Sequence, residues 1–107
     1  MEKVFNFLKK GNVDDLIKSV AIASANDAAV VLAEGVCGSV NEFVRRMNEK
    51  AVELGCINSN FVNPNGLPED NHYSCAYDMA IISSYLINNS LVLNYIKKNI
   101  EKIQGNN

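Results

Sequence analysis

Residues 39–55, SVNEFVRRMNEKAVELG, decide the fold because they carry the sequence signals of an α-helix with two defined ends. Ser39 and Glu42 form a capping box, in which each side chain bonds a backbone N–H group of the first turn. Gly55 follows the last apolar position and suits a left-handed C-terminal cap. The apolar residues between these signals recur at helical spacing: Val40, Phe43, Val44, Met47, Ala51 and Leu54. The stretch therefore predicts an amphipathic helix with one face on a core.

Helical periodicity continues on both sides of this stretch. We expect a helix over about 13–21, with Asp14 and Asp15 in its first turn, where the helix dipole favours negative charge. A second helix over about 27–36 is apolar nearly all round, which predicts burial on several sides. A fourth is expected from Ser74 to about Asn88, and Ser90 is expected to cap a fifth. The fourth is predicted to face inward with these residues: Met79, Ile82, Tyr85 and Leu86.

With 107 residues the chain is long enough for a single domain. We predict one all-α domain over residues 1–107, with about five helices in a compact bundle. Between the third and fourth helices lies an Asn-, Pro- and Gly-rich loop that Phe61, Val62 and Leu67 could pin down. A short strand at 60–62 is the one β-element that the sequence suggests.

Composition excludes several classes of function. The net charge is −2 and no lysine or arginine cluster occurs, so no nucleic-acid partner is predicted. No apolar run reaches the roughly 20 residues of a membrane span, and the first residues do not resemble a signal peptide. The three cysteines lack Cys-x-x-Cys spacing and are read as small buried or half-buried thiols, with no disulfide framework, metal or cofactor predicted.

Ser24-Ala25-Asn26 precedes the second helix and has two interpretations. Followed by Asp27, it fits the Ser-x-x-Asp pattern of a helix cap. In an extended segment or turn, however, residues two apart point the same way, so the Ser24 hydroxyl and the Asn26 amide could act together in catalysis. These four residues alone favour the cap.

Four blocks of sequence favour the catalytic interpretation of Ser24 and Asn26 over the helix cap. They are LIKSVAIASANDAAVVLAE, FVRRMNEKAVELG, NSNFVNPNGL and HYSCAYDMAII. In order and spacing they resemble the D-alanyl-D-alanine carboxypeptidases, the low-molecular-mass penicillin-binding proteins, from about Asn12 to Asn88. The resemblance implies the helical subdomain of the penicillin-binding and β-lactamase-like α/β fold. It also implies a substrate, a peptidoglycan peptide ending in D-Ala-D-Ala, and binding of β-lactams.

Three motifs build the active site in this family: Ser-x-x-Lys, Ser-x-Asn and Lys-Thr-Gly. The first serine attacks the substrate carbonyl and forms an acyl-enzyme. By resemblance, Ser24 relays a proton to the leaving amine, and Asn26 orients the substrate amide and the motif lysine. No serine here has a lysine three residues on, and no Lys-Thr-Gly occurs. We therefore expect a fragment, excised or from a truncated gene, that is inactive by itself and prone to form a homodimer.

Two departures from the family pattern fall outside the catalytic motifs. Asn65 stands where the family often has His, and Cys75 where Thr is usual. His72, the single histidine, is interpreted as structural or solvated, because a general base needs a nucleophile within reach.

Two alternatives remain open at this point. One is a class A β-lactamase-like fragment, and the other is a stand-alone helical interaction module in which Ser24 and Asn26 are caps. The family is extracytoplasmic, so the resemblance places the parent protein in the cell envelope, although an odd cysteine count fits an oxidising compartment poorly.

Overall fold

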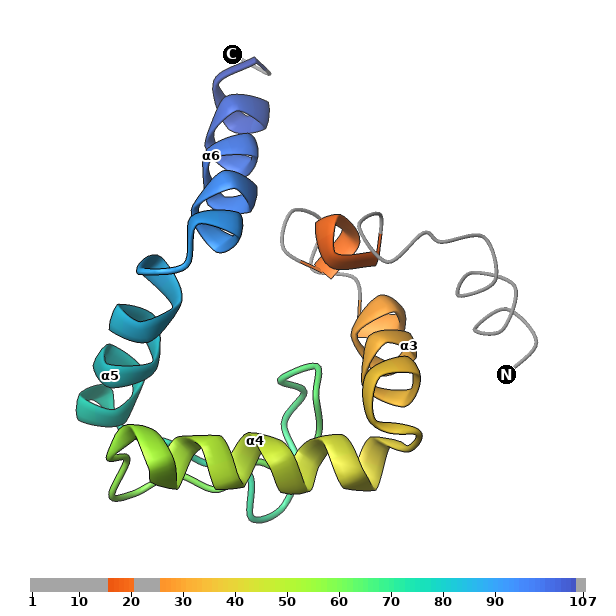
Figure 1. Cartoon of the computed structure of the whole chain (residues 1–107), viewed down its shortest axis with the longest axis vertical. Coiled ribbons are helices and arrows are strands. Elements are labelled where there is room, and N and C mark those ends of the chain that lie inside the picture. Colours follow the sequence, from red (N-terminus) through yellow and green to blue (C-terminus); the bar gives the residue numbers. More distant parts are fainter. Residues whose placement is uncertain (1–15, 21–25, 106–107) are drawn as a thin grey trace.

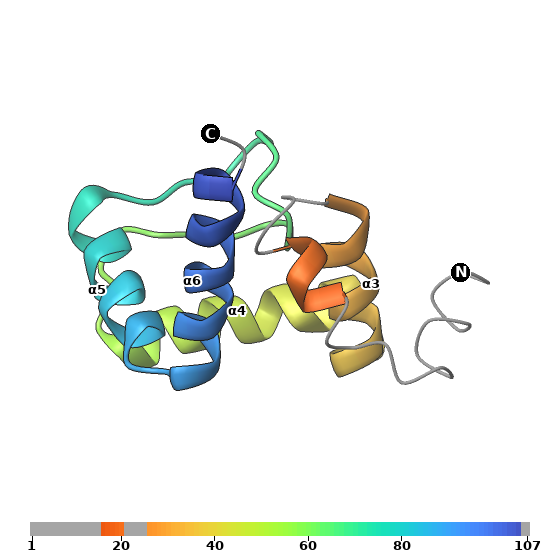
Figure 2. The same cartoon turned by 90° about the horizontal axis from the view of Figure 1, so that it is seen from above.

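The computed structural model describes residues 16–20 and 26–105, and the regular elements of those residues are helices. Helix α3 spans Asn26–Cys37, α4 Val40–Leu54, α5 Ala76–Ile87 and α6 Ser90–Gly105, and residues 16–20 are also helical. Helix α4 forms a base from which α3 and α5 rise at opposite ends, and α6 continues beyond α5 (Figure 1). Seen from above, α3 lies on one side and α5 and α6 on the other (Figure 2). The all-α prediction is confirmed.

Both ends of α4 lie where they were predicted, but only the Ser39 bond of the predicted capping box is present, because the Glu42 carboxylate bonds Arg45 instead. Ser39 is extended, with φ −156°, and its side chain accepts the Glu42 N–H at 3.1 Å. At the other end Gly55 has φ 98°, its N–H donates to Val52 O at 3.0 Å, and the Cys56 N–H donates to Ala51 O at 2.9 Å. This pair of bonds is the Schellman arrangement, which satisfies carbonyls that the end of a helix leaves free.

Two other helix starts lie one residue from the predicted caps. Helix α5 begins at Ala76, and Cys75 rather than Ser74 is its N-cap, with a sulfur that accepts the Asp78 N–H at 3.5 Å. Before α6, the Asn89 side chain accepts from Leu91 N at 3.0 Å and from Val92 N at 3.2 Å. Ser90 is therefore already inside the helix, because the neighbouring asparagine supplies the capping oxygen.

The buried apolar side chains are mostly small. Helix α3 buries three alanines and α4 one, together with two larger residues elsewhere: Ala28, Ala29, Ala33, Ala51, Leu16 and Tyr95. Alanines let helix backbones approach closely, and α3 packs on α4, α4 on α5, and α5 on α6. Many large apolar side chains stay exposed, among them Val36 at 66% and Ile87 at 51%. The burial on several sides predicted for the second helix is thus incomplete.

The inward face predicted for the fourth helix is only partly buried. Met79, Tyr85 and Leu86 are between 42% and 49% exposed, whereas the neighbouring Asp78 is fully buried. The apolar residues of α5 do recur at helical spacing. The α4–α5 loop, however, packs against the turn that carries Asp78 and buries that residue instead. The predicted strand at 60–62 is an isolated antiparallel bridge between Asn60 and Tyr73, with N–O distances of 2.9 and 3.0 Å.

Within the described residues, no single helix has the length and apolar character needed to cross a membrane; α5 and the first part of α6 meet that criterion only as a pair bent by 98°.

Candidate functional site

The two residues predicted to carry chemistry lie at the start of α3. Asn26 is the first residue of that helix and its side chain is exposed. Ser24 lies outside the described residues, so the geometry of the Ser24–Asn26 pair stays a prediction. The packing of α3 therefore leaves the Asn26 side chain uncovered.

The turn between α3 and α4 determines how α3 is held. Gly38 has φ 84°, a left-handed conformation that suits glycine, and its N–H donates to Glu34 O at 2.8 Å. Ser39 follows as the N-cap of α4. The chain therefore leaves one helix and enters the next within two residues, which fixes the direction of α3 and places Asn26 at the end of α3 away from α4 (Figure 1).

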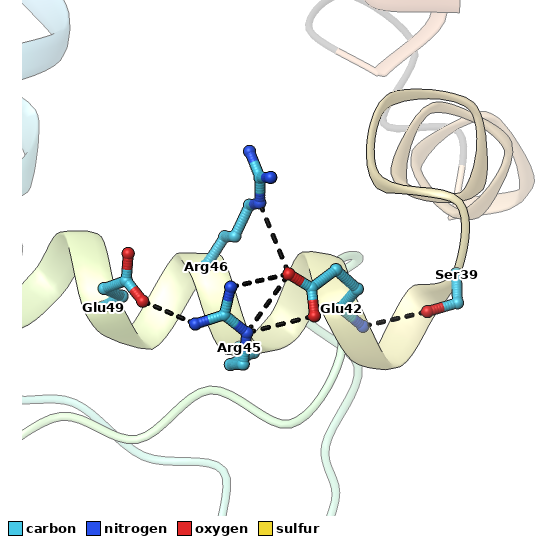
Figure 3. Close-up of polar contacts among 5 residues, drawn as sticks. All are labelled: Ser39, Glu42, Arg45, Arg46 and Glu49. Atoms are coloured by element: carbon cyan, nitrogen blue, oxygen red, sulfur yellow. Dashed lines mark hydrogen bonds and ion pairs between the residues drawn. The ribbon is translucent and has the colours of Figure 1, made fainter.

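Next to this turn, charged side chains form a network along the surface of α4 (Figure 3). Arg45 lies 2.6 Å from the Glu42 carboxylate and 2.6 Å from that of Glu49, and Arg46 lies 3.6 Å from Glu42. The hydrogen bond to Arg45 lowers the pKa of Glu42, and the same bond raises that of Arg45. All four side chains are exposed by more than a third, so the network is a solvated helix face.

The α4–α5 loop is tied down by Asp78, which reasoning from the sequence missed. Its carboxylate accepts from Ile57 N at 2.9 Å, from Asn58 N at 2.7 Å and from Ser59 Oγ at 2.7 Å. Ser59 Oγ is also 2.7 Å from Ser74 Oγ. Because the Ser59 hydrogen is used on Asp78, Ser74 is the donor in that second bond. A single carboxylate thus joins both ends of the loop.

Two opposing effects set the charge state of Asp78. Burial, the larger single effect, raises the pKa of its carboxyl, but the hydrogen bonds from Ser59 and from the Ile57 and Asn58 N–H groups together outweigh it. The pKa therefore lies below its usual range. The buried carboxylate is ionised and fully bonded, which makes it a structural anchor rather than an acid or base.

Other polar side chains hold the middle of the loop. Asn48 on α4 donates to Phe61 O and accepts from Phe61 N, both at 2.8 Å, so it replaces a strand partner. His72 Nδ1 accepts the Val62 N–H at 2.9 Å, and its ring meets Phe61 edge-on with 5.9 Å between centroids. His72 is therefore structural, as predicted. The loop has a defined conformation because side chains satisfy its backbone groups.

An apolar pocket of about 260 Å³ lies between α4, α5 and this loop. It is lined by Met47, Lys50, Ala51, Leu54, Phe61, Met79, Ile82, Tyr85 and Leu86. Lys50 contributes its aliphatic stem and sets its Nζ 4.8 Å from the centre of the Tyr85 ring. The residues predicted to face inward on α5 thus face this pocket. It holds no cluster of polar groups suited to catalysis.

Among residues 16–20 and 26–105, no group of three or more His, Cys, Asp or Glu side chains could hold a metal ion. Asp78 is the structural anchor that the sequence did not reveal. Its only local signal is an acid at the third position of a helix, which is common in first turns.

Comparison with solved structures shows which class of protein shares these helices and this loop. Penicillin-binding protein 5 from Haemophilus influenzae is 45% identical and superposes with a TM-score of 0.68, covering 70% of this chain and 22% of that one. Penicillin-binding protein 6B from Escherichia coli is 32% identical with a TM-score of 0.73, covering 76% and 26%. The described fold is therefore that of a helical part of penicillin-binding proteins.

The sequence comparisons narrow this class. The family model described as D-alanyl-D-alanine carboxypeptidase matches residues 2–106. The carboxypeptidase DacF from Bacillus subtilis is 44% identical over 106 residues, covering 90% of this chain and 27% of the relative, and DacA from Haemophilus influenzae is 46% identical over 76 residues, covering 71% and 19%. The chain belongs to the D-alanyl-D-alanine carboxypeptidase family. It spans about a quarter or less of the length of these relatives.

Proposed function

We propose that this chain is the helical subdomain of a serine D-Ala-D-Ala carboxypeptidase that trims peptidoglycan peptides through an acyl-enzyme. The family match over residues 2–106 is the observation that carries the proposal. The proposed substrate is a peptide ending in D-Ala-D-Ala, and β-lactams would acylate the whole enzyme at the same site. A related structure, penicillin-binding protein D2 from Listeria monocytogenes, is described in a cefotaxime-bound form, which supports this ligand class.

In this proposal Ser24 and Asn26 supply the Ser-x-Asn motif. Ser24 relays a proton toward the leaving amine, and Asn26 holds the substrate amide and the motif lysine. The exposure of Asn26 supports its role, as does the short Gly38–Ser39 turn that fixes the helix behind it. A group that positions a substrate must itself be held in place.

The sequence lacks Ser-x-x-Lys and Lys-Thr-Gly, so we propose that these 107 residues do not catalyse the reaction alone. Members of a catalytic unit act together, and loss of the nucleophile removes most of the rate. By family, the whole enzyme would act outside the cytoplasm at the cell envelope, without a nucleic-acid partner or cofactor.

A chimera tests the site. In DacF from Bacillus subtilis, the stretch aligned with this chain would be replaced by this chain, and acylation by a fluorescent penicillin would be timed. Ser24→Ala in the chimera should slow acylation about 10²–10⁴-fold, the usual value of a positioned acid–base group. Asn26→Ala should also slow acylation, because the substrate amide loses its positioning partner.

Ser39→Ala is the matched control, because Ser39 is a serine that caps a helix in this same chain. It should cost about 0.5–2 kcal/mol of stability and leave the acylation rate unchanged. If Ser24→Ala lowers the melting temperature but acylates at the rate of the parent chimera, Ser24 is only a cap. Covalent penicillin on this chain alone, seen by intact-mass spectrometry, would contradict the proposed inactivity.

A further inference from the structure

Cys56 and Cys75 lie at the two ends of the α4–α5 loop, and both sulfurs contact the same residue. Cys56 Sγ is 3.9 Å from the carbonyl oxygen of Asp78, and Cys75 Sγ is 3.5 Å from its backbone nitrogen. Both cysteines are half-buried free thiols, so neither is sealed from small reagents. The third cysteine, Cys37, is the last residue of α3 and belongs to another element.

We propose that Cys56 and Cys75 form a redox pair that closes into an intramolecular disulfide on reaction with a low-molecular-weight disulfide such as oxidised glutathione. The two segments are already held together, because Ser59 bonds both Ser74 and Asp78. The antiparallel Asn60–Tyr73 bridge continues this pairing. Both sulfurs lie within 4 Å of backbone atoms of Asp78, so the fold holds the two thiols beside the same residue. A disulfide needs a Cα separation of about 4.4–6.8 Å.

The exchange has two balanced steps. First, the Cys75 thiolate attacks one sulfur of the small disulfide, forms a mixed disulfide and releases one small thiolate. The Cys56 thiolate then attacks the Cys75 sulfur, closes the protein disulfide and releases the second small thiolate. The two cysteine protons end on the two released thiols, so the protein pair is oxidised and the small disulfide is reduced.

The order of the two steps follows from the environment of Cys56. Burial raises the pKa of its thiol, and the nearby Asp78 charge and Cys75 add to that effect. A thiol with less thiolate is the slower attacking group. Cys75 is therefore the thiol that reacts with the small disulfide, and Cys56 is the one that resolves the mixed disulfide.

The test uses the whole chain with Cys37→Ser, treated with oxidised glutathione at pH 8 and analysed by intact-mass spectrometry. We expect a net loss of two hydrogens with no glutathione retained, and a Cys56–Cys75 cross-link in the peptide map. In the Cys37→Ser background, Cys56→Ser should retain one glutathione on Cys75. Closure in the native protein should be at least about tenfold faster than in denaturant, because folding holds the pair together.

Two outcomes would overturn the proposal. One is a Cys37→Ser protein that retains glutathione on both cysteines or stays unmodified. The other is closure at the same rate in denaturant and in the folded protein, which would show that the fold contributes nothing. Cys75→Ser replaces the capping sulfur of α5 with a hydroxyl oxygen, which also accepts the Asp78 N–H, so this control is expected to fold and to react slowly at Cys56.

Discussion

The Asp78 side chain holds the α4–α5 loop in place through hydrogen bonds rather than through apolar packing. Its carboxylate accepts from Ile57 N, Asn58 N and Ser59 Oγ, and it is fully buried. Leaving such donors without an acceptor costs their full desolvation. At the scale of single residues, stability near the pocket therefore depends on one ionised group.

Asp78→Asn is expected to lower the melting temperature at pH 7 by about 4 °C or more, because a side-chain amide replaces one accepting oxygen with a donor. Since the folded pKa of Asp78 lies below its unfolded value of 3.8, its stabilisation is complete above that value. It is lost as pH falls further through the folded pKa. Thermal melts from pH 8 to pH 2 should show the gap between parent and variant closing only in acid.

The control for this experiment is Asp70→Asn, which changes an exposed carboxylate in the same loop. It should leave the melting curve almost unchanged across that pH range. A gap between the parent and Asp78→Asn that stays constant down to pH 2 would contradict the role given to the ionised carboxylate.

Among the helices, the C-terminal end of α4 is a place where the effect of backbone conformation can be separated from that of packing. Gly55 has φ 98°, and a Cβ built on it would meet no heavy atom within 4 Å. Any cost of adding a side chain there therefore comes from the left-handed conformation. The Schellman bonds at this end also set the direction in which the chain enters the loop.

Gly55→Ala is expected to destabilise the chain by about 1–2 kcal/mol, the cost of a left-handed residue with a Cβ. Gly55→Asn should cost less, because asparagine tolerates this conformation. Urea unfolding followed by circular dichroism measures both. Equal losses for the two variants would show that space rather than backbone conformation sets the cost.

At the scale of the whole molecule, most of the large exposed apolar side chains among the described residues lie on α5 and α6 rather than on α3, the helix whose sequence is apolar nearly all round. The larger exposed residues on these two helices are Tyr77, Met79, Tyr85, Leu86, Ile87, Leu91, Leu93 and Ile96. On α3, by contrast, three alanines are buried and Val36 is exposed. Exposed apolar patches of several hundred Å² commonly mark contact surfaces.

We therefore expect the isolated chain to self-associate through α5 and α6 as concentration rises. The double variant Ile87→Glu and Leu91→Glu should shift the chain toward monomer, because it places charge in that contact. Analytical ultracentrifugation from micromolar to near-millimolar protein measures the shift. Val52→Glu is the control, since Val52 is 75% exposed on α4. A parent chain that stays monomeric over the whole range would refute the expectation.

The sequence by itself determined the helices and the family. The ends of α4 could be predicted from Ser39, Glu42 and Gly55 because caps are bonds between residues three to five apart. The α5 and α6 caps were each missed by one residue, because adjacent polar side chains compete for the same N–H groups. The family resemblance depends on blocks of sequence, and the comparison over residues 2–106 confirmed it.

Only the tertiary structure decided which side chains are buried and which are joined. Asp78 meets residues 19 to 21 positions away, and nothing in the local pattern of α5 distinguishes it from an exposed first-turn acid. The contacts of Cys56 and Cys75 with Asp78 and the exposure of Met79 likewise depend on how the loop folds back onto α5. Helix signals are local and survive in the sequence, whereas burial depends on contacts between segments that the sequence keeps apart.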